Sequence, residues 1–262
     1  MSDFTALILN EHIKIYRRVR TWIMLFILAG ISVLMPVLFY LTGGQSSDFG
    51  VWDSFQVTLS LAFILNTIFT IVVASDSVAG EFSWGTIKLL LIRPWSRSKI
   101  LLSKYLSLIL FSLASTVLMI ALNYITSAIF FSGTASELAT APSGWSITGY
   151  SLMLVVCRYI ELFLILTLTF MLSAVFRTSS LAIGLSLFLV FTKSIFNAIF
   201  NPERYEWAKY LLFTHLDLSV YLVNKTGLGG TTLGFSVAVL AAYYIVFMLL
   251  AWFVFRKRDV AA

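Results

Sequence analysis

Six stretches of about 20 or more mostly apolar residues divide this chain, and they limit the folds open to it. They occupy residues 21–41, 55–75, 105–131, 147–176, 180–200 and 233–255. A helix of that length crosses the roughly 30 Å hydrocarbon core of a bilayer, and backbone groups in lipid must be hydrogen-bonded within the segment. The sequence therefore predicts an all-α polytopic membrane protein with six transmembrane helices, forming a single transmembrane domain over residues 1–262.

The composition and the charge distribution agree with this prediction. The chain is 60% hydrophobic and 11% charged, whereas soluble domains are roughly 45–50% apolar and about 25% charged. Lys and Arg gather before the first stretch, between the second and third, and after the last, while the connections at 42–54 and 132–146 carry none. The positive-inside rule then predicts that both termini are cytoplasmic in a cell (plasma) membrane. Positive charge spread beside apolar stretches does not predict a nucleic-acid partner.

Residues that could carry chemistry are sparse. Cys157 is the only cysteine, and His12 and His215 lie far apart in the sequence. We therefore expect no metal site and no cofactor bound by this chain. A hydrolase inside the membrane would need a histidine cluster, paired acids or a serine with its base, so an intramembrane enzyme is not expected either.

Three charged residues fall inside the predicted spans. Arg158 and Glu161 are three residues apart, so they share a helix face and are expected to pair or to face a cavity. Their pairing could be structural, or it could form a polar patch in a substrate path. Lys193 has no evident partner in the sequence, and we expect it to reach toward the interface or to line a dimer interface.

Two segments outside the spans have an amphipathic pattern. In residues 1–20, Phe4 and Leu7 belong to an apolar stripe while Lys14 lies on another face, which predicts a helix in the membrane interface. A generic positive anchor for the first span would explain the same pattern. Residues 201–232 repeat large apolar residues at near-helical spacing and predict a segment partly embedded in the outer interface.

The connection between the second and third spans contains a short apolar run at residues 86–92. It is too apolar for a solvated loop and too short to cross the membrane. Pro94 ends the helical pattern, and Ser96 is placed to cap the helix that continues through Lys104. An exposed apolar helix of this kind favours docking into a groove of another protein, although it could also seal the bundle by lying on its surface.

This connection resembles the signature of ABC-2 type transporter permeases, and with the six spans the likeness extends over essentially the whole chain. The matching glycines and the lysine at the third span are Gly80, Gly85 and Lys104. The resemblance implies that residues 80–97 form a coupling-helix region that docks on an ATPase. The implied ATPase-coupling residues are Glu81, Gly85, Thr86, Ile87, Leu89, Leu90, Pro94, Ser96 and Arg97. It also implies outer re-entrant helices between spans five and six.

The function implied by the resemblance is that of a permease subunit in a bacterial ATP-driven ABC exporter. Its partners would be two ABC ATPase subunits, which hold ATP and Mg, and a second permease copy in a homodimer or heterodimer. The chain itself would be non-catalytic. An aromatic-rich, weakly charged interior favours a hydrophobic or amphipathic cargo such as a peptide, antibiotic or lipid. The alternatives are an ion-gradient-driven secondary transporter and a non-transporting regulatory membrane subunit.

Overall fold

The computed structural model describes residues 2–42, 50–83, 85, 95–131, 142 and 144–257. Within these ranges the chain contains helices and no strand, so the all-α prediction is confirmed. The helices are α1 (Ser2–Tyr16), α2 (Val19–Leu41), α3 (Val51–Ser83), α5 (Arg97–Phe130), α6 (Ile147–Phe176), α7 (Ser179–Ile199), η1 (Glu206–Tyr210), α8 (Leu212–His215), α9 (Val220–Val223), η2 (Leu228–Gly230) and α10 (Leu233–Lys257).

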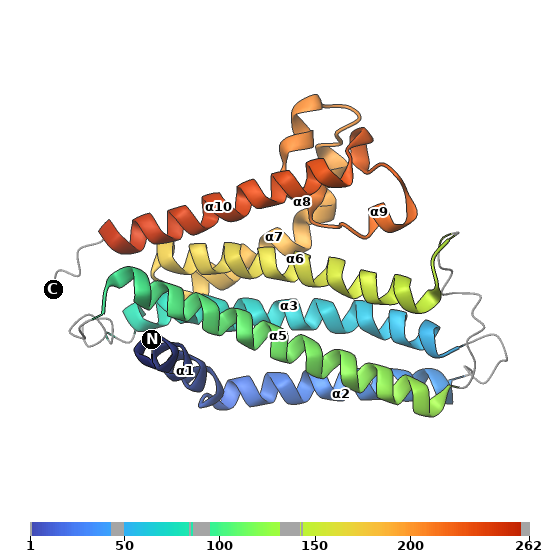
Figure 1. The fold of residues 1–262 in the computed structure, drawn as a ribbon, viewed down its shortest axis with the longest axis horizontal. Helices are drawn as coiled ribbons and strands as arrows, with labels where there is room; N and C mark the ends of the chain where they lie inside the picture. Colours follow the sequence, from blue (N-terminus) through green and yellow to red (C-terminus); the bar gives the residue numbers. More distant parts are fainter. Residues whose placement is uncertain are drawn as a thin grey trace.

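Six of these helices, α2, α3, α5, α6, α7 and α10, are long and apolar enough to cross a membrane. The prediction of six such helices is confirmed. Figure 1 shows them side by side in one bundle, with α1 and the end of α10 at the same end, here called the terminal end. The opposite end of the bundle, where α6 begins, is here called the far end. The short helices η1, α8, α9 and η2 form what we call the far-end segment, although its helix α8 packs near the middle of α6, with Leu212 and Leu216 in one apolar cluster with Leu164 and Leu168.

Helices α3 and α5 are much longer than a bilayer requires. They contain 33 and 34 residues, compared with about 20 for a span. The extra turns of α3 run to Ser83 at the terminal end, and those of α5 begin there at Arg97. Ser96 accepts a hydrogen bond from the Lys99 amide at 3.4 Å, which confirms the predicted cap of α5.

Helices α6 and α7 form a tight hairpin, because only Arg177 and Thr178 lie between them. Arg177 ends α6 in the left-handed region, with φ of 58°, and α7 begins two residues later. The two helices are therefore antiparallel neighbours and contact each other. This contact brings together side chains such as Glu161 and Lys193, which are 32 residues apart in the sequence.

Helix α3 lies at the centre of the bundle, in contact with α2, α5, α6 and α7. Polar side chains join it to its neighbours: Asn66 donates to Thr116 on α5 at 2.9 Å, and Ser173 of α6 donates to the Ser75 carbonyl at 2.6 Å. Asn123 donates to the Phe55 carbonyl at 3.0 Å. Such bonds between helices hold membrane bundles together, where lipid offers no alternative partner.

Helices α2, α7 and α10 form the periphery and keep large apolar side chains exposed. Phe26, Phe191 and Leu249 are 71%, 61% and 57% exposed. Exposed apolar surface on this scale suits contact with lipid or with another membrane subunit. The fold thus has a centre around α3 that is joined by hydrogen bonds between helices, and an apolar outer face.

Candidate functional site: two charged clusters

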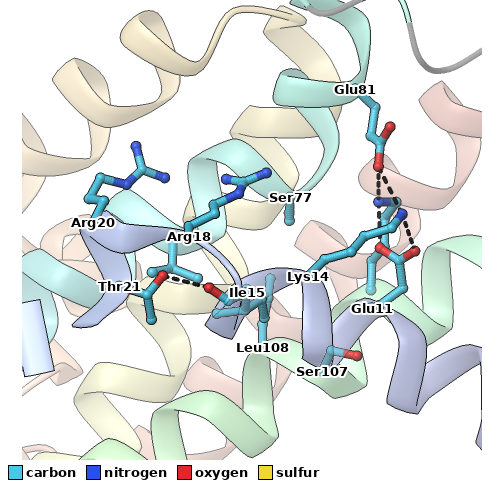
Figure 2. Close-up of a pocket in the computed structure, with 12 residues that line it drawn as sticks. Glu11, Lys14, Ile15, Arg18, Arg20, Thr21, Ser77, Glu81, Ser107 and Leu108 are labelled. Carbon is cyan, nitrogen blue, oxygen red and sulfur yellow. Dashed lines mark hydrogen bonds and ion pairs between the residues drawn. The ribbon is translucent and has the colours of Figure 1, made fainter.

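Four charged side chains meet at the terminal end and join three helices. Lys104 of α5 contacts Glu11 of α1 at 2.8 Å and Glu81 of α3 at 3.1 Å. Lys14 of α1 contacts the same two carboxylates at 2.6 and 3.3 Å. Figure 2 shows Glu11, Lys14 and Glu81 turned toward one another. We call Glu11, Lys14, Glu81 and Lys104 the terminal charge cluster.

Burial makes this cluster more than a surface ion pair. The Lys104 side chain is only 3% exposed, so its ammonium depends on the two carboxylates for its stabilisation. Burial alone would raise the pKa of Glu11, but the charges and hydrogen bonds of Lys104 and Lys14 outweigh it and hold that pKa below its usual range. Ser107 adds a hydrogen bond to the Ile8 carbonyl at 2.9 Å. Helix α1 is therefore fastened to α5 by both charge and hydrogen bonding.

A third carboxylate at this end, that of Asp76 on α3, lies between two arginines. It accepts from Arg18 at 2.9 Å and also contacts Arg20. Burial lowers the pKa of Arg18, and the nearby Asp76 partly opposes that shift. This group ties the α1–α2 turn to α3, one to two turns before Glu81.

The space enclosed by these charged groups is small. The cavity they line measures about 30 Å³, which is room for a water molecule and not for a larger ligand. Among the described residues, no group of three His, Cys, Asp or Glu side chains is arranged to hold a metal ion. The arrangement suits a mechanical link between α1, α3 and α5 better than a binding site.

The structure describes some of the predicted coupling residues and not others. Glu81 belongs to the terminal charge cluster, and Ser96 caps α5. Gly85 follows α3 with φ of +68°, a left-handed conformation that favours glycine after a helix end. Arg97 donates to the Arg256 carbonyl at the end of α10, at 3.1 Å. The remaining predicted residues, Thr86, Ile87, Leu89, Leu90 and Pro94, lie outside the described residues.

A second cluster lies inside the bundle between α6 and α7. Arg158 donates to Glu161 at 3.2 Å, as their spacing predicted, and Lys193 contacts the other oxygen of Glu161. Lys193, for which the sequence indicates no partner, meets Glu161 because the α6–α7 hairpin brings the two side chains together. We call Arg158, Glu161 and Lys193 the intramembrane triad. Asp217, between α8 and α9, lies 3.6 Å from Arg158.

Sequence reasoning missed Glu11, Asp76 and Asp217 as members of these clusters. A usable signal existed for Asp76, which directly follows an apolar span and therefore needs a cationic partner near the membrane. Glu11 is likewise an acid within a basic, amphipathic segment. For Asp217 no local pattern indicates a partner, because its contact depends on how the far-end segment folds back onto α6.

Comparison with known proteins gives a family and two uncharacterised relatives. The chain is 40% identical over 227 residues to "Uncharacterized protein YhcI" of Bacillus subtilis (strain 168), covering 83% of this chain and 71% of that protein. It is 28% identical over 251 residues to "Uncharacterized membrane protein YdbK" of the same organism, covering 94% and 99%. The latter description agrees with a multi-pass membrane protein. Residues 19–261 match the family described as "Protein of unknown function (DUF2705)", and the chain belongs to that family.

Proposed function

We propose that this chain is the permease subunit of a bacterial ABC-2 type exporter, driven by ATPase subunits on separate chains. The observation that carries the proposal is the terminal charge cluster. Through Lys104 it joins α3 and α5, the two helices that flank the predicted coupling segment, to each other and to α1. In this role residues 80–97 dock on the ATPase.

The cluster supports coupling because of where it sits. A force applied to residues 80–97 acts on the ends of α3 and α5, and a flexible attachment would absorb it. Here Glu81 and Lys104 are paired and Glu11 ties in α1, so the three helices respond together. Coupling of this kind also requires that the ATPase contact the segment differently in its ATP-bound and ATP-free states.

The partners follow from the same proposal. Two ATPase subunits hold ATP and Mg, and a second permease copy, identical or related, completes the pathway. Both termini and residues 80–97 face the cytoplasm. Helix α1 lies in the membrane interface, a role that fits its exposed Leu9 and Ile13, which are 58% and 43% exposed. The cargo is hydrophobic or amphipathic.

The test is assembly with the ATPase encoded beside this chain. Leu90→Asp places a charge on the proposed apolar docking surface and should abolish co-elution of the ATPase from mild detergent. Leu228→Asp makes the same change on η2 at the far end, where Leu228 is 42% exposed, and should leave co-elution intact. Undiminished co-elution with Leu90→Asp would reject the assignment of residues 80–97 as the docking surface.

A further inference from the structure

A cavity of about 300 Å³ opens between α3, α6 and α7. This volume is at the lower end of the roughly 300–1,000 Å³ typical of ligand pockets. The intramembrane triad forms its charged wall. Apolar side chains, among them Phe63, Ile165 and Val190, form the rest of the lining together with hydroxyls such as that of Ser60.

The charged wall has more hydrogen-bond donors than acceptors. Glu161 uses one carboxylate oxygen for Arg158 and the other for Lys193. A guanidinium offers five N–H groups and an ammonium offers three. The contacts with Glu161 therefore use only a minority of the donors of Arg158 and Lys193. Asp217 is 3.6 Å from Arg158, beyond hydrogen-bonding distance, and its side chain is 41% exposed. A group rich in acceptors and negatively charged would complete this wall.

The charged and apolar parts of the lining lie at different depths. Helix α6 runs away from the far end, so Ile165 lies roughly 6 Å deeper than Glu161 at 1.5 Å per residue. Helix α7 runs toward the far end, so Val190 lies roughly 4.5 Å farther from that end than Lys193. Lys193 itself is about 9 Å from the end of α7 at Ile199. On α6 and α7 the apolar lining residues are thus displaced from Glu161 and Lys193 toward the terminal end.

We propose that this cavity binds a single-chain amphiphile with an acidic head group. The head group accepts hydrogen bonds from Arg158 and Lys193, and the alkyl chain lies against Phe63, Ile165 and Val190. A cationic head group would have to compete for Glu161 oxygens that are already engaged. The site is contained within one copy of the chain, so it does not depend on the exporter proposal.

The first experiment compares head groups on the unaltered chain. The protein is placed in phosphatidylcholine nanodiscs and titrated calorimetrically with dodecyl phosphate or dodecyltrimethylammonium, and empty nanodiscs give the partitioning into lipid. Dodecyl phosphate should bind at least about tenfold more tightly, a difference equal to one net ionic contact. Equal affinities, or tighter binding of the cation, would overturn the proposal.

Variants then locate the site. Lys193→Met keeps most of the apolar stem but removes the ammonium, and it should weaken dodecyl phosphate binding about tenfold. Lys225→Met, at an exposed position between α9 and η2, should not. Equal effects would place binding elsewhere. If Lys193→Met fails to fold, the comparison of head groups still decides the question.

A last experiment distinguishes binding of a free single-chain amphiphile from binding of a membrane lipid of similar charge. Dioleoyl phosphatidylglycerol should bind more weakly than dodecyl phosphate, because two long chains exceed the cavity. Tighter binding of the phospholipid would contradict the single-chain assignment. Failure of both acidic ligands to bind, while the ATPase still co-elutes, would reject this site and leave the exporter proposal standing.

Discussion

Lys104 shows how one buried cation can organise the end of a membrane bundle. Its ammonium lies within hydrogen-bonding distance of carboxylates from two other helices, Glu11 at 2.8 Å and Glu81 at 3.1 Å. A buried charge destabilises the folded protein unless it is paired. Removing one member of a buried pair is therefore strongly destabilising, because the other charge is left uncompensated. These contacts therefore make the packing of α1, α3 and α5 interdependent.

Removing this cation should destabilise the protein measurably. Lys104→Met removes the buried cation that contacts both Glu11 and Glu81, and we expect a loss of about 3 kcal/mol in the free energy of unfolding. Adding Glu11→Gln should recover part of it, because one uncompensated carboxylate disappears. Denaturant titration in mixed micelles measures both.

The matched control is Lys99→Met, an exposed lysine on the same helix. It should change the free energy of unfolding by no more than about 0.5 kcal/mol. Equal losses for Lys99→Met and Lys104→Met would show that Lys104 has no special role in holding the three helices together.

Among the elements, the far-end segment depends on one buried histidine. His215, at the end of α8, is 1% exposed. Its Nε2 lies 2.6 Å from the Lys209 carbonyl, which can only accept, so Nε2 carries the proton. Nδ1 then accepts from the Ser236 hydroxyl at 2.7 Å. This neutral histidine ties η1 and α8 to the start of α10.

This link should weaken in acid. Burial lowers the pKa of His215 below its ordinary value of 6.5. A histidine with a depressed pKa in the folded state gives stability that is complete above pH 6.5 and is lost as the pH falls through the folded value. Hydrogen exchange of residues 206–223, corrected for intrinsic rates, should therefore rise in mild acid.

Two variants check the origin of that change. His215→Gln should remove most of the pH dependence of exchange in residues 206–223. His12→Gln, on α1 at the other end of the bundle, should leave it unaltered. The same acid response in the His215→Gln variant would exclude this histidine as its source.

The sequence predicted those features of the helices that a local residue pattern determines. The apolar stretches gave the six long helices, Ser96 was recognised as a cap, and i, i+3 spacing gave the Arg158–Glu161 pair. Contacts between distant segments escaped prediction. The partner of Lys193 depends on which faces of α6 and α7 meet, and the terminal charge cluster depends on which helices become neighbours. Helical periodicity alone specifies neither.

At the scale of the whole molecule, the charged clusters and the exposed apolar faces divide the bundle into regions. The terminal charge cluster joins α1 to the end of α3 and the start of α5, and the intramembrane triad lines a cavity between α3, α6 and α7. The exposed apolar surfaces of α2, α7 and α10 remain for lipid or a second copy. This division fits the proposed half-transporter, which would receive force at one end and bind an amphiphile within the bundle.

The mass of the assembly formed by the unaltered chain tests this account most directly. The chain is co-expressed with the ATPase encoded beside it, purified in mild detergent and measured by native mass spectrometry. The account predicts a complex of two permease chains, identical or related, with two ATPase subunits. A folded, helical chain that elutes without any ATPase would contradict it.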